Sequence, residues 1–370
     1  MSNISCHQAG PWWCTVVEMW NVTAPASLPI SGLLLAILGL VLWSLYSGKP
    51  TLDPHDLILF DKTYQERLDI RKNLVKEHPQ KIIGITNGAD PRIGAAIREL
   101  YHTLMGNYLP QRYPTIFESK DSSIRNTVTG ESWPTNLTDS TPARLALEIL
   151  PVNVDEDFFI LLPDNQTDMK RTAGDEDETT YILEAYSACF PSGFEPQHKL
   201  GKKLASIHDP VPGYKERLEK SMDRFFRTLP PGKYVRRVNW AVTVDEELYS
   251  NFDKSGNAMT KEFKQLGVDD LDLDKVCVLD ILVVPRREDV DGKQTFLRCE
   301  RQTLHRLPQS NAIIFAFHTY LYPLEQVKAE GLGEELATAI DGLTRGNTPD
   351  IFLYKNGPKW AAAVKQYLRS

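Results

Sequence analysis

Apolar residues alternate with polar ones, or run together in short stretches, throughout the region from residue 151 to residue 323. Six of these runs have the length and the β-branched and aromatic content that are typical of strands. They cover residues 157–163, 181–190, 234–244, 276–285, 296–308 and 311–323. Only Gln309 and Ser310 separate the last two runs, which predicts that these two pair as an antiparallel hairpin.

Helical and loop-forming sequence over residues 193–229 separates the second run from the third. Within it, apolar residues recur at intervals of three and four, which is the spacing of one helix face. These residues are Tyr214, Leu218, Met222, Phe225 and Leu229. Two strands, a helical crossover and then further strands is the order of a PAS-like α+β domain, although many α+β domains share it. We therefore predict the α+β class, with a PAS-like antiparallel sheet around a ligand pocket.

Further helices are predicted on both sides of this region. Amphipathic spacing indicates helices at 63–78, 91–106, 324–343 and 358–368. Residues 109–143 are rich in Pro, Ser, Thr and Asn, so we expect a long surface loop there. The expected organisation is an N-terminal helical and loop region at 54–150, a PAS-like domain at 151–323 and C-terminal helices at 324–370.

One stretch near the amino end follows neither pattern. Residues 28–46 are almost wholly apolar, and as a helix they would span about 28 Å, close to the hydrocarbon thickness of a bilayer. A cleaved signal peptide would need a basic region before a shorter apolar core. Residues 1–27 contain no Lys or Arg. The segment is therefore expected to be a retained transmembrane helix that follows a short tail at residues 1–27.

Charge predicts the orientation of this helix. The basic residues nearest to it all follow it, namely Lys49, Lys62, Arg67, Arg71 and Lys72. Basic residues flanking a span face the cytosol in most membrane proteins. The chain is therefore expected to be a single-pass membrane protein, with the endoplasmic reticulum as a candidate location. Its N-terminal tail would be lumenal and its large domain cytosolic.

Composition narrows the function classes. The chain has 370 residues, 42% hydrophobic and 25% charged, which is typical of globular rather than disordered or collagen-like proteins. With 42 Lys and Arg against 49 Asp and Glu, the net charge of −7 argues against a nucleic-acid partner. The five cysteines form no CxxC pair, which argues against a zinc ribbon or a thioredoxin-type site. The sequence also lacks P-loop, GxGxxG, HExxH and GxSxG motifs.

His208 is the histidine with the most distinctive surroundings. It is followed by the sequence Asp-Pro-Val-Pro-Gly, in which two prolines stiffen the backbone, and then by the amphipathic helix described above. This order holds His208 at the mouth of an apolar groove, as an axial metal or haem ligand requires. On the residues alone, a turn-stabilising histidine is the commoner interpretation.

Two of the predicted strands carry polar residues at regular spacing. Alternation over 299–306 places Glu300, Gln302 and Leu304 on one face, and Cys299, Arg301, Thr303 and His305 on the other. The sequence Arg236-Arg237-Val238-Asn239-Trp240 is the second such strand. Its arginines could neutralise carboxylates such as haem propionates. The alternative is cross-strand ion pairing of these arginines with Glu300 or Asp245.

Four of these stretches, taken in order, resemble the haem-dependent oxidative N-demethylase family, whose fungal members are called HRQ family proteins. They are ACFPSGF, KLGKKLASIHDPVPGY, MDRFFRTLPPGKYVRRVNWAV and ERQTLHRLPQSNAIIFAFHTY. The similarity runs from about residue 60 to residue 323 and includes TYQERLDIRKNLV and QRYPTIFE upstream. Four ordered motifs are far more specific than any one of them.

The resemblance implies a PAS-like fold that binds haem b. It also implies O2-dependent N-demethylation of a small amine, with electrons from NADPH through a separate flavin and iron–sulfur reductase. Carried over by position, His208 is the axial haem ligand, and Glu300 is the catalytic carboxylate that holds the cationic amine. The resemblance assigns the pocket to Arg237, Asn239, Trp240, Arg301 and Gln302. The alternative function is a haem-binding PAS-type sensor, or a binding module without turnover.

Overall fold

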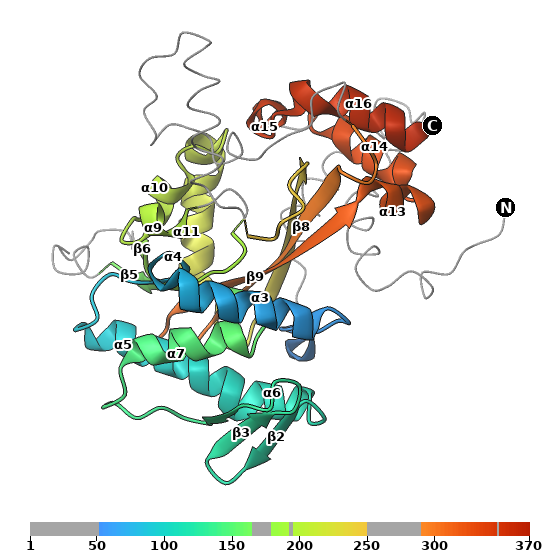
Figure 1. Cartoon of the computed structure of the whole chain (residues 1–370). Helices are drawn as coiled ribbons and strands as arrows, with labels where there is room; N and C mark the ends of the chain where they lie inside the picture. The colour runs from blue at the N-terminus through green and yellow to red at the C-terminus, as the bar shows by residue number, and fades with distance from the viewer. Residues whose placement is uncertain (1–51, 165–178, 192–194, 250–289, 346–347) are drawn as a thin grey trace, which may run out of the picture.

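A six-stranded antiparallel sheet runs through the centre of the molecule (Figure 1). The computed structural model describes residues 52–164, 179–191, 195–249, 290–345 and 348–370. The strands are β1 (Ile83–Ile85), β5 (Asp157–Pro163), β6 (Tyr181–Ser187), β7 (Val235–Thr243), β8 (Phe296–Arg306) and β9 (Ile313–Pro323). Their order in the sheet is β1-β6-β5-β9-β8-β7. The expected strand at 276–285 lies outside the described residues.

The hairpin of β8 and β9 is the longest pairing in the described sheet. Its register runs from Phe296 opposite Pro323 to Arg306 opposite Ile313, which confirms the predicted pair. Asn311 adopts a left-handed backbone conformation (φ 57°) in the turn. The amides of Gln309 and Ser310 both donate to the carboxylate of Glu99, at 2.7 Å each. Glu99 lies on a helix of the neighbouring layer, so the turn is fixed from outside the sheet.

The predicted helical crossover is present between β6 and β7. It comprises α9 (Pro196–Lys199), α10 (Leu204–His208), η4 (Tyr214–Leu218) and α11 (Glu219–Thr228). Gly213, at φ 71°, occupies the left-handed region that ordinary residues rarely adopt and starts η4. Apolar residues of the crossover, among them Leu204, Phe226 and Leu229, pack with those of the sheet in one hydrophobic cluster.

The N-terminal layer covers the other face of the sheet. Its helices are α3 (Tyr64–Glu77), α5 (Pro91–Tyr101), α6 (Leu109–Arg112) and α7 (Ala143–Ile149). A three-stranded sheet is attached to it, formed by β2 (Phe117–Lys120), β3 (Ser123–Asn126) and β4 (Ser132–Pro134). The expected long loop at 109–143 is therefore partly regular structure. Its polar composition concealed the strands because β2 and β4 are largely exposed.

The C-terminal helices lie at the far end of the β8–β9 hairpin (Figure 1). They are α13 (Leu324–Ala329), α14 (Gly333–Gly342), α15 (Asp350–Tyr354) and α16 (Gly357–Arg369). The single helix expected at 324–343 is divided at Gly331, whose φ of 78° interrupts it. Trp360 is fully buried and belongs to the same cluster as Trp240 of β7. This unit is therefore packed onto the end of the sheet.

The expectation of a membrane-spanning helix is corrected. Across the part of the chain that the structure describes, no helix combines the length and the apolar character that crossing a bilayer requires. Residues 1–27 and 28–46 themselves lie outside the described residues. The expectation rested on the apolar character of the segment and on the charges around it, neither of which measures the structure that the segment adopts. The α+β class with an antiparallel sheet stands, whereas the transmembrane helix and the single-pass placement do not.

A buried ionic cluster joins the N-terminal layer to the sheet. Arg71 of α3 is fully buried, and its Nε lies 2.8 Å from a carboxylate oxygen of Asp155. Its Nη1 lies 2.7 Å from the carboxylate of Asp157, and Arg67 pairs with the second oxygen of Asp155. Removing one partner of such a group leaves an uncompensated buried charge.

We expect Arg71→Met to lower the free energy of unfolding by about 3–5 kcal/mol, because two buried carboxylates lose their cation. Urea-induced unfolding of the full chain measures this loss. Lys72→Met is the matched control on the same helix, since Lys72 pairs with Glu131 at the surface, where a pair contributes about 0–1 kcal/mol. A loss at Arg71 no larger than at Lys72 would contradict the prediction.

Candidate functional site

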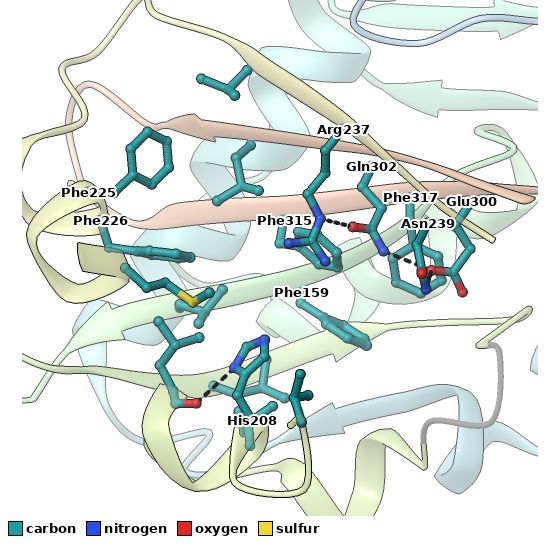
Figure 2. A pocket seen from close by; sticks show the side chains of 18 of the residues that line it. Phe159, His208, Phe225, Phe226, Arg237, Asn239, Glu300, Gln302, Phe315 and Phe317 are labelled. Carbon is teal, nitrogen blue, oxygen red and sulfur yellow. Dashed lines mark hydrogen bonds between the residues drawn. The ribbon is translucent and has the colours of Figure 1, made fainter. Parts of the chain in front are cut away.

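A cavity of about 470 Å³ lies between the crossover and the sheet. Ligand sites in proteins have volumes of about 300–1,000 Å³, so the cavity can hold a sizeable organic group. Aromatic side chains line much of it, namely Phe159, Phe225, Phe226, Phe315 and Phe317. Figure 2 shows His208 on one wall and a row of polar side chains on the other.

His208 is the last residue of α10 and lines the cavity. Its Nδ1 lies 2.9 Å from the carbonyl oxygen of Leu204, one turn back. A carbonyl only accepts hydrogen bonds, so Nδ1 carries the proton and Nε2 keeps a lone pair. The ring also stacks on Tyr214, with centroids 5.0 Å apart. Burial lowers the pKa of His208, which favours the neutral imidazole that a metal requires.

The polar row on the sheet comes from two neighbouring strands. The register places Arg237 of β7 opposite Gln302 of β8, and Asn239 opposite Glu300. Nε of Arg237 donates to Oε1 of Gln302, and Nε2 of Gln302 donates to Oε2 of Glu300 at 2.8 Å. Nδ2 of Asn239 approaches the same Glu300 oxygen at 3.4 Å. Four side chains are thus linked in one row along the cavity (Figure 2).

The structure also addresses the alternative of cross-strand ion pairs. Among the described residues, no ion pair within 4.0 Å joins Glu300 to either arginine of β7, and the Gln302 amide stands between Arg237 and Glu300. Glu300 therefore receives amide donors rather than a direct cation. Arg237 stays exposed because its guanidinium faces the open cavity and not the core.

Two of the expected pocket residues do not line the cavity. Side chains alternate along a strand, so Arg301 and Trp240 point to the opposite face from Glu300 and Asn239. Arg301 is buried in the N-terminal layer, where its guanidinium donates to the carbonyl oxygens of Asp56 and Leu57. Trp240 packs against the C-terminal helices. The other five expected residues, His208, Arg237, Asn239, Glu300 and Gln302, all line the cavity.

Arg236, which the sequence offered together with Arg237 as a partner for propionates, stands opposite Thr303 in the register, so its side chain points to the other face of the sheet, with Arg301. Sequence reasoning did not assign Tyr354, which lines the cavity although it comes from α15 in the C-terminal unit. No local pattern marks Tyr354, because α15 reaches the cavity only through tertiary packing.

Comparison with protein families identifies the family of this chain. The family model described as haem-dependent oxidative N-demethylase, alpha subunit-like, matches residues 48–365. The chain belongs to this family. The match covers every described element from the N-terminal layer to most of α16, including all the cavity-lining residues.

The residues of the cavity fit the haem that the name of this N-demethylase family specifies. A single imidazole with its Nδ1 proton held by a backbone carbonyl is a common arrangement for a metal-ligating histidine. The aromatic lining suits a flat apolar macrocycle. The exposed guanidinium of Arg237, which lines the cavity, suits an anionic carboxylate. The assignment of His208 as the axial ligand stays a prediction.

The two histidines of the β8–β9 hairpin lie on the other face of the sheet from this haem cavity. Nδ1 of His318 lies 2.6 Å from the carbonyl oxygen of Asp155, within the ionic cluster. His305 is fully buried, and both its ring nitrogens lack a hydrogen-bond partner among the described residues. Burial lowers the pKa of each of the two to about 4.

His305 is therefore expected to make the fold sensitive to acid. Its pKa is about 4 in the folded chain and 6.5 in the unfolded one, so only the unfolded state takes up a proton between these values. The free energy of unfolding therefore decreases as the pH falls from about 6.5 to about 4, and at pH 5 it is about 2 kcal/mol lower than at neutral pH.

The experiment compares the wild type with His305→Leu by urea-induced unfolding at pH 7.5 and pH 5.0. Between the two pH values, the free energy of unfolding of the wild type should fall by about 2 kcal/mol more than that of the variant. Equal losses in the two proteins would show that His305 is not buried in a neutral form.

Proposed function

We propose that the protein is a haem-dependent mono-oxygenase that demethylates a small amine with O2 and electrons from an external donor. One observation carries the proposal: a single neutral imidazole and an amide-held carboxylate line opposite walls of one aromatic cavity. The first group suits the haem that the family name specifies, and the second suits a cationic substrate.

His208 would hold the haem iron through Nε2, and Arg237 would pair with a propionate. Haem b, when bound, supplies O2 activation, and a neutral imidazole ligand makes the site globin-like or peroxidase-like rather than thiolate-type. The hydrogen bond to Leu204 and the stack on Tyr214 keep the imidazole in one orientation. The aromatic side chains exclude water from the space between the two walls.

Glu300 would bind the ammonium group of the amine. Both hydrogen bonds that its carboxylate accepts from the described residues end at Oε2, so Oε1 accepts none from them. An ammonium group can therefore donate to Oε1 in a charge-assisted hydrogen bond. The aromatic faces of the cavity stabilise a cation further. Glu300, or a water bound to it, is also placed to move a proton during the reaction.

The electron donor is a further part of the proposal. The family resemblance suggests NADPH-derived electrons that arrive through a separate flavin and iron–sulfur reductase. Such a partner would have to reach the haem edge from outside the chain.

His208→Ala is expected to abolish the Soret band of protein reconstituted with haem b, because the iron loses its only side-chain ligand from the cavity wall. Added imidazole should restore part of the band by filling the same space. His198→Ala is the control, since His198 lies nearby on α9 with its side chain 68% exposed. An unchanged spectrum in His208→Ala would exclude His208 as the ligand.

Glu300→Gln keeps the shape of the side chain and removes its charge. We expect kcat/KM for dimethylamine to fall about tenfold to a hundredfold, the range for loss of one charge-assisted hydrogen bond. Formaldehyde release with O2 and a chemical reductant measures this, and the haem content should not change. Glu118→Gln, on the exposed surface of β2, is the control. Wild-type protein that binds haem but releases no formaldehyde would instead be a sensor or a binding module.

A further inference from the structure

The C-terminal unit contacts the polar row of the cavity through Lys355. Lys355 directly follows α15, next to the cavity-lining Tyr354. Its Nζ donates to the carbonyl oxygen of Trp240 at 2.6 Å and to Oδ1 of Asn239 at 3.3 Å. The ammonium group also lies 5.4 Å from the centre of the Trp240 ring.

These contacts decide which way the Asn239 amide points. An ammonium group has only donors, so it must face the amide oxygen. The amide nitrogen of Asn239 then faces Oε2 of Glu300, as the 3.4 Å contact shows. The reversed amide would place its oxygen against the carboxylate and its NH2 group against the lysine. Both contacts would be lost.

Gln302 is oriented in the same way from the other side. Arg237 also has only donors, so it holds the Gln302 oxygen and directs the Gln302 NH2 group to Oε2 of Glu300. The full row is Arg237, Gln302, Glu300, Asn239 and Lys355. Arg237 and Lys355 thus each orient one amide, and both amides donate to the Glu300 carboxylate. Neither cation forms a direct ion pair with that carboxylate.

We propose that Lys355 is a positioning residue for amine binding: it fixes the Asn239 amide so that Glu300 is held with one oxygen directed to the substrate. The C-terminal helices are then part of the substrate site. The inference rests on the proposed function in one respect, namely that the bound ligand is an amine. The orientation of the Asn239 side-chain amide depends on the protein alone.

A purely structural role makes a different prediction. The hydrogen bond to the Trp240 carbonyl could simply attach the C-terminal unit to β7, in which case the loss of Lys355 would lower stability without acting through Asn239. The two roles separate in a double-mutant cycle. The effect of Lys355→Met on amine affinity should disappear in an Asn239→Ala background if Lys355 acts through that amide.

The first experiment titrates the haem-loaded full chain with dimethylamine and follows the haem absorption spectrum. Lys355→Met should raise the Kd about fivefold to tenfold, the loss expected for one hydrogen bond, with haem content unchanged. Lys355→Arg should recover part of the affinity. Lys359→Met, an exposed lysine one turn further on, should have no effect. A Kd within twofold of wild type in Lys355→Met, or the same loss with and without Asn239, would overturn the proposal.

The second experiment needs neither haem nor amine. In protein labelled with 15N-asparagine, the Asn239 side-chain NH2 signal is identified by its absence in Asn239→Ala. It should shift in Glu300→Gln and lose its protection from solvent exchange in Lys355→Met. An unaltered signal in Lys355→Met would overturn the positioning role. A wild type that shows the expected amide signal but no response to dimethylamine would instead count against the proposed substrate.

Discussion

Burial of β8 on both faces is the constraint on which the rest of the structure depends. All eleven residues of this strand, Phe296–Arg306, are buried, although several carry charge. Alternate side chains point to opposite faces, and a buried polar group needs a partner. Two different layers must therefore supply those partners. The crossover and the cavity meet one face, and the N-terminal layer meets the other.

On the N-terminal side, Arg301 of β8 donates to the carbonyl oxygens of Asp56 and Leu57. The ionic cluster of the same layer also fixes a wall of the cavity. Asp157 accepts hydrogen bonds from the backbone amides of Cys189 and Phe190, at 2.8 and 2.7 Å. The guanidinium groups of Arg67 and Arg71 lie over the Phe190 ring, 5.1 and 4.4 Å from its centre. The chain leaves this cluster and continues directly into Pro191, which lines the cavity. Charged groups outside the cavity thus hold in place a segment that lines it.

The sequence was most informative where local periodicity determines structure. The hairpin, the crossover and the positions of Glu300 and Gln302 follow from alternation and helical spacing, and they were predicted. Arg301 and Trp240 show the limit of motif resemblance, because a stretch can belong to a site while half of its side chains point away. Lys355 and Tyr354 could not have been found, since only the packing of the C-terminal helices brings them near β7. The membrane-spanning helix expected from the apolar segment at 28–46 has no counterpart among the described helices.

The polar row gives the cavity a cationic end at Arg237 and an anionic end at Glu300. Arg237 lies at one end of the polar row, and Asn239, two residues further along β7, lies beside Glu300. Two residues of strand correspond to about 7 Å, so opposite charges would pair directly if nothing intervened. Gln302 and Asn239 prevent this, because neutral amides can link charged groups without cancelling them. The arginine end stays available to an anionic group and the carboxylate end to a cationic one. The haem that the family name specifies carries propionates, which suit the arginine end, and the carboxylate end is the one that the proposed ammonium substrate would use.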